Sequence, residues 1–461
     1  MPNDDQISTP STPASAAAPA RANEQGVLAS EGRGSFRVDA LPMKFTFELT
    51  GDCNLHCFFC DCEFGRNEFR KRGVTKFSMD EATFRTLAEN AFPKATVVNP
   101  TVVGEPFTFP YFDLMLEYCE KYGTKLEIIT NGMLLKGPRV ERLLPLLDRL
   151  TISFDGGTKE TFEKCRTGSK FDVVIKNLRD FRDRRRALGL ESQVKFSFGV
   201  TLMRENIEEF PRIVEWARDL DATEVCAAHL LVFTKELKSS SLFQEKELSN
   251  RMIAAARKRA VELGVKLEAP APFDVSAAAG LVGTDLPAFD GRVDDEQGFT
   301  GRAPRLEHTV PLGQAPRVTE TEPKPELGAS APAKPSAPPI HLAHESPAPD
   351  WAKDRYWCKF AWREAFILHS GDVAPCCHQG RPVMGNVFRQ PWDEIWNGEA
   401  YQAIRRGLYD KQPTPFCSTC SLLAEQGHVP YSEEGYIFDD RYPEQSRADR
   451  RPPKEKPTPP A

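Results

Sequence analysis

The alternation of strand-like and helix-like segments between residues 38 and 269 constrains the fold more than any other feature. Runs rich in apolar and β-branched residues are separated by stretches with helical spacing of apolar residues. The expected strands are 43–49, 95–103, 125–130, 149–154, 194–202 and 224–230. The expected helices are 78–92, with Ser78 as N-cap and Glu81 completing a capping box, and 111–121, 140–147, 172–188, 207–220 and 245–263. This order predicts an α/β fold with a parallel sheet and right-handed crossovers, which either stays open or curls into a barrel.

Composition divides the rest of the chain. Residues 1–37 are rich in Ala, Pro and Ser, and we expect them to be disordered. Residues 270–350 hold 14 of the 38 prolines and read as a Pro/Ala-rich disordered insertion or linker. A second ordered region is expected over residues 351–440, followed by a disordered tail at 441–461.

Bulk properties narrow the function classes. The formal net charge of -6 argues against nucleic acid or an anionic membrane as partner. The N-terminus lacks a basic start with an apolar run, and no stretch of ~20 apolar residues could span a membrane. We therefore expect a cytoplasmic protein. Most of the 12 cysteines fall into two groups, which in a reducing compartment indicates metal binding or redox chemistry rather than disulfides.

The first group follows the first expected strand, where the carboxyl ends of parallel strands collect chemistry. Cys53, Cys57 and Cys60 have the spacing C-x3-C-x2-C. Four thiolates normally complete a cubane iron–sulfur cluster, so three leave one iron open to a substrate or cofactor. The alternative is a zinc loop with Cys62 as fourth ligand, although Cys60-x-Cys62 is tight for structural zinc.

The segment Gly51–Cys60 is similar to the signature loop of radical S-adenosylmethionine (radical SAM) enzymes. The resemblance implies a partial (β/α)6 TIM-type barrel over residues 38–269 and a [4Fe–4S] cluster held by these three cysteines. It also implies S-adenosylmethionine on the open iron and reductive formation of a 5′-deoxyadenosyl radical that abstracts hydrogen.

Matching segments at later strand ends supply the expected contacts to S-adenosylmethionine. By resemblance, Phe59 lies against the adenine, and Gly104 and Glu105 meet the amino group. Asn131 lies in a matching Thr-Asn-Gly segment, Ser153 is a candidate for the ribose and Arg166 for the carboxylate. If these residues do not bind a cofactor, Ser153 would form a hydrogen bond with the backbone at the end of its strand, and Arg166 would be a surface arginine.

The second group of cysteines comprises Cys358, Cys376, Cys417 and Cys420 and could hold zinc or an iron–sulfur cluster. The context, with a Ser-Gly-Asp hairpin at 366–373 and the segments 385–387 and 392–397, resembles the small α+β SPASM/twitch domain that follows many radical SAM barrels. The resemblance implies one auxiliary [4Fe–4S] cluster with all four ligands from the protein. Cys377 is a spare that could replace Cys376, donate a hydrogen atom or simply be packed.

Three hypotheses for function remain open. The first is a radical dehydrogenase acting on an alcohol or polyol-type small molecule, with the auxiliary cluster accepting an electron. The second is a radical maturase of a peptide that forms a crosslink or thioether or epimerises a residue, with Cys226 or Cys377 as a possible hydrogen donor. The third is a non-catalytic iron–sulfur or zinc scaffold. Glu224, His229 and His378 are expected to be structural or exposed. For either enzyme we expect a flavodoxin- or ferredoxin-type reductant.

Overall fold

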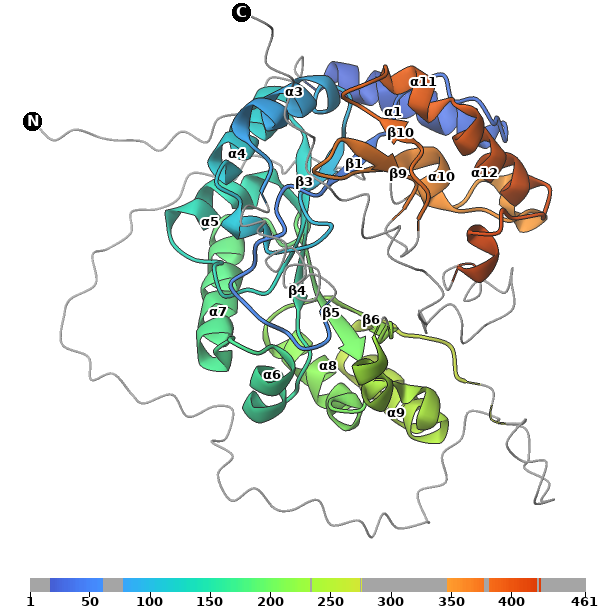
Figure 1. The fold of residues 1–461 in the computed structure, drawn as a ribbon. Coiled ribbons are helices and arrows are strands. Elements are labelled where there is room, and N and C mark those ends of the chain that lie inside the picture. The colour runs from blue at the N-terminus through green and yellow to red at the C-terminus, as the bar shows by residue number, and fades with distance from the viewer. Residues whose placement is uncertain are drawn as a thin grey trace, which may run out of the picture. The chain divides into compact units, whose positions relative to one another are not determined.

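The computed structural model describes residues 17–60, 78–232, 234–273, 275, 346–376, 381–420 and 423. The chain divides into one unit of residues 1–274 and 339–461 and a second of residues 275–338. All elements below belong to the first unit (Figure 1). The expected insertion therefore lies almost wholly outside the described residues, as does the expected tail at 441–461.

A single sheet of ten strands forms the centre of this unit, in the order β10-β9-β8-β1-β2-β3-β4-β5-β6-β7. Seven consecutive parallel strands are β1 Lys44–Phe47, β2 Val97–Asn99, β3 Lys125–Thr130, β4 Leu147–Ser153, β5 Lys195–Leu202, β6 Glu224–His229 and β7 Lys266–Glu268. The connecting helices are α3 Glu81–Ala91, α4 Phe112–Tyr122, α5 Pro138–Leu143, α6 Lys159–Cys165, α7 Phe171–Ala187, α8 Phe210–Asp219 and α9 Lys246–Leu263. Short 3-10 turns are η1 Pro106–Thr108, η2 Leu144–Leu146, η3 Ile207–Glu209, η4 Lys235–Ser240, η5 Leu242–Gln244, η8 Asp350–Lys353 and η9 Cys417–Thr419. The six expected strands are all present, whereas β7 and α6 were not predicted.

Side chains alternate across the sheet, as strand geometry requires. On β3, Leu126 and Ile128 are fully buried, whereas Ile129 on the opposite face is 37% exposed. Figure 1 shows the helices outside the curved sheet, so the buried set packs against them. We call the other side, which carries Lys44, Glu127, Arg149 and Thr151, the inner face.

The C-terminal region extends the same sheet rather than forming a separate one. Strand β8, Glu364–Ile367, pairs parallel with β1, with Lys44 opposite Glu364. β9, Asp372–Ala374, then runs antiparallel to β8, and β10, Gly385–Asn386, runs antiparallel to β9. The expected Ser-Gly-Asp hairpin is confirmed, with Gly371 at φ +80° donating its N–H to Leu368 O. The accompanying helices are α10 Lys359–Arg363, α11 Trp392–Trp396 and α12 Glu399–Tyr409.

The expectation of disorder over residues 1–37 is wrong for part of that segment. Helix α1, Ala18–Gly32, begins with Pro19 in its first turn and buries Val27. Glu31 at its end forms an ion pair with Arg363, 2.8 Å apart, and both side chains are at most 2% exposed. The Ala-rich composition that suggested disorder also favours a helix, and a tertiary contact stabilises it here.

The N-cap predicted for α3 is also wrong. The helix begins at Glu81, and the Asp80 carboxylate accepts a hydrogen bond from Thr83 N. Ser78 instead lies 2.7 Å from the Thr50 hydroxyl and donates to Asp52 at 3.1 Å. A serine expected to start a helix therefore stabilises the beginning of the first cysteine segment.

Candidate active site

The three cysteines of the first group lie in the segment that leaves the carboxyl end of β1. We call residues 50–60 the cysteine loop. Its start is held by Asp52 O, which accepts hydrogen bonds from Glu105 N at 2.8 Å and the Thr108 hydroxyl at 3.1 Å. Its middle is held by His56 N, which donates to Thr167 O at 2.9 Å. Segments that follow two other strands, β2 and β4, thus fix the cysteine loop.

Gly104 permits the closest of these approaches. Its φ is +78°, and a Cβ added there would lie 2.4 Å from Thr50 O and 2.7 Å from Asp52 O. No other residue fits without moving the backbone of the cysteine loop. The expected contact of Gly104 with a cofactor stays a prediction, but its contact with the loop is direct.

The three thiols are close enough to affect one another. Burial raises the pKa of the Cys57 thiol to about 11, the Arg166 guanidinium opposes that rise, and Cys60 and Cys53 add to it. Cys53 Sγ also accepts a hydrogen bond from Leu55 N at 3.4 Å. A partly buried trio of thiols beside an arginine fits a cluster with negative charge. Cys62, the alternative fourth ligand, lies outside the described residues.

Glu105 has its partners within the protein. It is 1% exposed, and its carboxylate accepts hydrogen bonds from the Thr130 hydroxyl at 2.7 Å and from Asn131 N at 2.9 Å. Glu105 therefore joins the loop after β2 to the end of β3, and a contact between its carboxylate and S-adenosylmethionine stays a prediction.

Asn131 is also turned toward the cysteine loop. Its Nδ2 donates to Asn54 Oδ1 at 2.9 Å and lies 3.8 Å from Cys53 Sγ. Its Oδ1 accepts a hydrogen bond from Met133 N. The side chain thus bonds to other residues of the protein, and its contact with S-adenosylmethionine stays a prediction.

Arg166 has a partner that sequence analysis did not single out. Its guanidinium lies 2.6 Å from Asp155, whose side chain is fully buried. Burial opposes a higher pKa for Arg166, but Asp155 and the Cys57 thiol raise it. The guanidinium also lies 6.0 Å from the centre of the Phe59 ring. Arg166 and Phe59 are thus brought together beside the cysteines, and their roles toward S-adenosylmethionine remain predictions.

Ser153 ends β4 on the inner face, opposite Gly199 of β5. No hydrogen bond joins its hydroxyl to another residue within the part of the chain that the structure describes. A contact with a cofactor ribose stays a prediction for this side chain.

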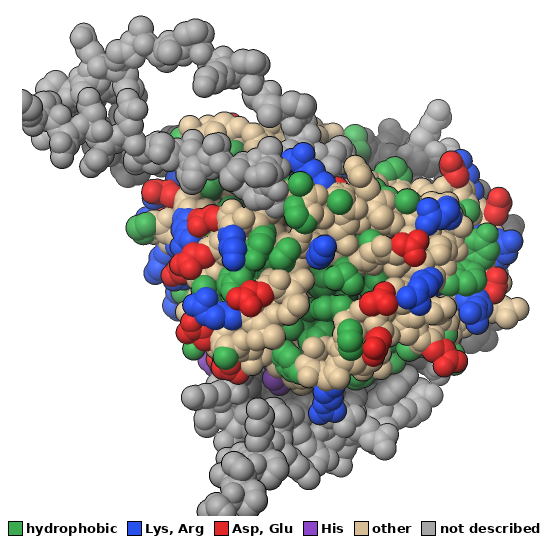
Figure 2. Space-filling view, turned by 90° about the horizontal axis from the view of Figure 1, so that it is seen from above, with side chains coloured by type: hydrophobic (Ala, Val, Ile, Leu, Met, Phe, Trp, Pro, Cys, Tyr) green, Lys and Arg blue, Asp and Glu red, His purple; other side chains and the backbone are tan. Residues whose placement is uncertain are grey.

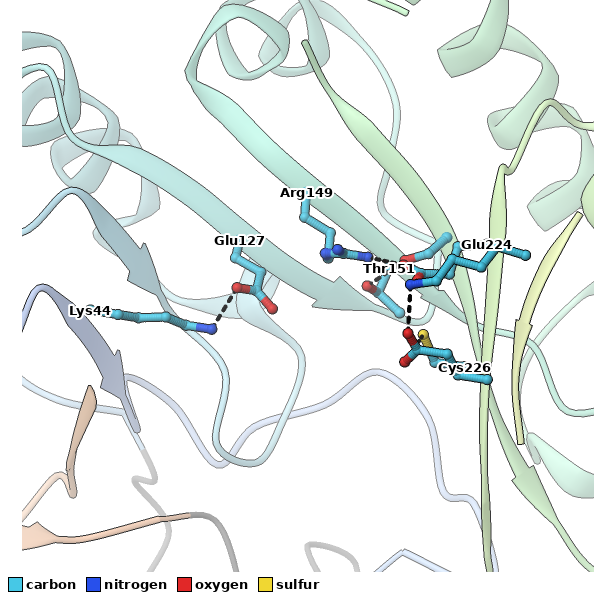
Figure 3. Close-up of polar contacts among 9 residues, drawn as sticks. Lys44, Glu127, Arg149, Thr151, Glu224 and Cys226 are labelled. Carbon is cyan, nitrogen blue, oxygen red and sulfur yellow. Dashed lines mark hydrogen bonds and ion pairs between the residues drawn. The ribbon is translucent and has the colours of Figure 1, made fainter. Parts of the chain in front are cut away.

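The inner face carries a belt of charged side chains below the carboxyl edge (Figure 3). Lys44 Nζ lies 2.6 Å from Glu127 and 3.5 Å from Glu364, while Arg149 pairs with Glu224. Burial opposes a higher pKa for Lys44, but Glu364 and Glu127 raise it, so this lysine stays charged.

One step nearer the carboxyl edge, the inner face carries small neutral groups. The hydroxyls of Thr151 and Ser197 lie 2.8 Å apart, and Gly199 adds no side chain. Cys226 lies here too, and burial, with Glu224 and Glu268 adding to it, raises the pKa of its thiol to about 12. The inner face is therefore hydrophilic both at the belt of charged side chains and one step nearer the carboxyl edge.

Glu224 and His229 have structural partners, as expected. Glu224 pairs with Arg149 and Lys266, and these two hydrogen bonds lower the pKa of its carboxyl although burial opposes them. His229 is buried, 3.1 Å from Ser249, and stacks on Phe273. Cys377 and His378 lie outside the described residues.

Three cysteines of the second group, Cys358, Cys417 and Cys420, lie near one another at the start of α10. Burial raises the pKa of the Cys358 thiol to about 12, while backbone N–H groups of Phe360 and Ala361 point to its sulfur and lower it; Cys420 and Cys417 lie near enough to raise it. Cys376 follows β9 and is near Tyr401. A buried sulfur that receives backbone N–H groups suits a bound cluster thiolate.

A pair of polar residues that was not predicted from the sequence, His369 and Glu48, lies at the carboxyl end of β1. His369 Nδ1 lies 3.2 Å from Glu48 Oε2, and the imidazole is 34% exposed whereas Glu48 is 6% exposed. Only Leu49 separates Glu48 from the cysteine loop, and His369 lies in the β8–β9 turn. Only the pairing of β8 with β1 brings them together, and neither residue has a local signal.

Two protein-family models match the regions of the chain that carry the two cysteine groups. Residues 47–217, which contain the cysteine loop, match the model described as "Radical SAM superfamily". The chain belongs to the radical SAM superfamily. Residues 358–421 match SPASM, described as an iron–sulfur cluster-binding domain. This radical SAM enzyme therefore has a [4Fe–4S] cluster and S-adenosylmethionine in its barrel and a further [4Fe–4S] cluster in its SPASM domain. A non-catalytic scaffold is thereby set aside.

Relatives of this radical SAM enzyme are similar over part of their length. An AdoMet-dependent heme synthase of Methanosarcina barkeri is 27% identical over 39% of this chain and 48% of its own. A PqqA peptide cyclase of Gluconobacter oxydans is 25% identical over 47% of this chain and 58% of its own. The chain spans about half the length of the curated relatives it matches.

The fold is also seen in solved structures. Streptococcus suis SuiB is 14% identical, with a TM-score of 0.50, over 83% of this chain and 71% of SuiB. Among the described residues no helix has the length and apolar character needed to cross a bilayer. On the face shown in Figure 2, acidic and basic side chains are interspersed.

Proposed function

We propose that this radical SAM enzyme oxidises a small polar substrate, an alcohol or polyol, by two electrons. The observation that supports this proposal is the hydrophilic character of the inner face. Charged side chains of Lys44, Glu127 and Arg149 and hydroxyls of Thr151 and Ser197 line the face that leads to the cysteine loop. Such a surface suits hydroxyl and amino groups, which can add hydrogen bonds to these charged and hydroxyl groups, whereas an apolar ligand would only displace water from them.

Bound S-adenosylmethionine supplies the radical that removes a hydrogen atom, and the auxiliary cluster supplies an acceptor for the remaining electron. The residues of the chain must then remove one proton, so that an alcohol becomes a ketone. His369 is the candidate acceptor of that proton. Glu48, 3.2 Å away, would orient the imidazole and stabilise its charged form. A flavodoxin- or ferredoxin-type protein is the proposed source of electrons.

The test uses anaerobically reconstituted enzyme with dithionite, S-adenosylmethionine and a panel of aminocyclitols, sugars and short peptides. We expect one compound of the first two classes to lose two hydrogens per 5′-deoxyadenosine formed, measured by mass spectrometry. An unchanged mass with deuterium uptake from solvent, or a crosslinked peptide, would contradict oxidation of a polyol.

His369→Gln tests the proton acceptor in the same assay. We expect 5′-deoxyadenosine to form at the wild-type rate while oxidised product falls by at least about a hundredfold, a typical loss for a general base. Glu48→Gln should give a smaller loss, because it removes only the orienting carboxylate. Equal product yield in His369→Gln would contradict this role.

A second candidate is maturation of a peptide. It is favoured by the similarity to a protein named PqqA peptide cyclase. The Cys226 thiol stays protonated at neutral pH and could return a hydrogen atom in an epimerisation. The peptide arm of the panel distinguishes this candidate from the first.

A further inference from the structure

The sulfur of Cys53 receives two N–H groups, and one of them comes from a side chain. Leu55 N lies 3.4 Å from Cys53 Sγ within the cysteine loop itself. Asn131 Nδ2 lies 3.8 Å from the same sulfur and comes from the end of β3, 78 residues away in sequence. Hydrogen bonds to cluster sulfurs are among the main determinants of reduction potential.

The orientation of the Asn131 amide is fixed by its neighbours. The Oδ1 atom accepts a hydrogen bond from Met133 N at 3.0 Å, so the NH2 group must point the other way. That group donates to Asn54 Oδ1 at 2.9 Å, which leaves its second hydrogen for the sulfur. The side chain is only 4% exposed, so water does not compete for these contacts.

The backbone of Asn131 is anchored as well. Its N–H donates to Glu105 Oε2 at 2.9 Å, and the other oxygen of Glu105 accepts from the Thr130 hydroxyl. Glu105 N in turn donates to Asp52 O, in the cysteine loop. A closed circuit thus runs from the loop through Glu105 to Asn131 and back to Cys53. The donor is held in place before any cluster binds.

We propose that Asn131 is a positioning residue that donates a hydrogen bond to the Cys53 thiolate and raises the reduction potential of the cluster that binds S-adenosylmethionine. A donor near sulfur stabilises the extra negative charge of the reduced cluster more than the oxidised form. The role holds whichever substrate the enzyme takes, because it rests on the cluster and not on the proposed oxidation.

The experiment measures the midpoint potential of each cluster by redox titration followed by electron paramagnetic resonance. The cluster whose signal changes when S-adenosylmethionine is added is the one held by the cysteine loop. In Asn131→Asp, which keeps the acceptor for Met133 N but lacks the N–H, and in Asn131→Ala, we expect that potential to become more negative. The expected change is at least tenfold in the equilibrium for reduction, about 59 mV for a one-electron couple.

The auxiliary cluster serves as an internal reference, and its potential should not move. Asn99→Ala is the matched control, since Asn99 also ends a strand and its side chain accepts from Thr101 N. Unchanged potentials in both Asn131 variants would overturn the proposal, as would an equal shift in Asn99→Ala.

If neither variant holds the first cluster, the wild-type protein labelled with 15N-asparagine decides. We expect a 15N coupling to the reduced cluster in pulsed electron paramagnetic resonance, and that coupling should persist in Asn54→Ala. Its absence from the wild type would equally overturn the proposal.

Discussion

Gly104 shows how one residue can control the placement of three metal ligands. The backbone of the cysteine loop passes so close that a single methyl group would collide with two of its carbonyl oxygens. Both of those oxygens belong to the segment that directly precedes Cys53. A substitution at Gly104 should therefore weaken binding of the cluster more than it lowers the stability of the fold.

Gly104→Ala should lose the first cluster while keeping the auxiliary one. The substitution adds the cost of a positive φ, about 1 kcal/mol, and a clash that only a shift of the loop can relieve. Iron per chain should fall to about half of the wild-type value after reconstitution. Gly189→Ala is the control, because Gly189 has φ +64° but nothing within 4 Å of an added Cβ. Full iron content in Gly104→Ala would argue against this close contact.

His229 should make stability depend on pH. Burial lowers its pKa from 6.5 to about 4, so the folded state resists the proton that the unfolded chain takes up. Stability is then complete above pH 6.5 and falls as the pH drops toward 4. By pH 5.5 the loss should be about 1.4 kcal/mol. Urea unfolding of wild type and His229→Gln, compared at pH 7.5 and 5.5, should show a loss that is larger in the wild type by about this amount. Equal losses in the two proteins would contradict the prediction.

At the scale of elements, α1 is the part that sequence analysis could not place. It has few apolar residues, so the sequence shows no apolar face with helical spacing. Its main contacts are with residues more than three hundred positions away. Glu31 bonds Arg363 and the Trp357 indole, and its carbonyl accepts from Trp351 Nε1. One carboxylate thus joins the N-terminal helix to the C-terminal region.

Glu31→Gln should destabilise the fold by about 3–5 kcal/mol, since it leaves a buried guanidinium without its charge partner. The matched control is Glu81→Gln, which breaks the exposed pair of Glu81 with Arg85 and should cost less than about 1 kcal/mol. Urea unfolding curves give both values. Similar small losses in the two variants would mean that α1 contributes little.

Local patterns predicted the strands and helices of the barrel closely. Strand β3 lies at 125–130 as expected, because a run such as KLEIIT carries its own β propensity and alternation. Strand β7 was missed because its residues, Lys-Leu-Glu, include only one apolar side chain. The pairing of β8 with β1 was missed because pairing between distant segments leaves no local trace.

The candidate site was predictable only in part, for a related reason. Spacing identified Cys53, Cys57 and Cys60, since ligands of one loop are neighbours in sequence. The roles of Glu105 and Asn131 depend on which way a side chain turns at a strand end, and that is decided by partners on other strands. The partners Asp155 and Glu48 were missed for the same reason.

At the scale of the whole molecule, two clusters should load independently. We expect about eight irons per chain, four in each cluster. Alanine at Cys53, Cys57 and Cys60 should leave about four and abolish formation of 5′-deoxyadenosine. Alanine at Cys358, Cys417 and Cys420 should also leave about four, but should keep slow cleavage of S-adenosylmethionine. Loss of all iron in either triple variant would show that the clusters do not load separately.

The pairing of β8 with β1 has a consequence for how the protein is made. One edge of β1 is paired as soon as β2 has been synthesised, but the other edge has no partner until the SPASM region follows. An edge strand of this kind invites wrong pairing while it waits. Chains released before that point would carry the cysteine loop beside an open strand edge, so they should need chaperones until the SPASM region has been synthesised.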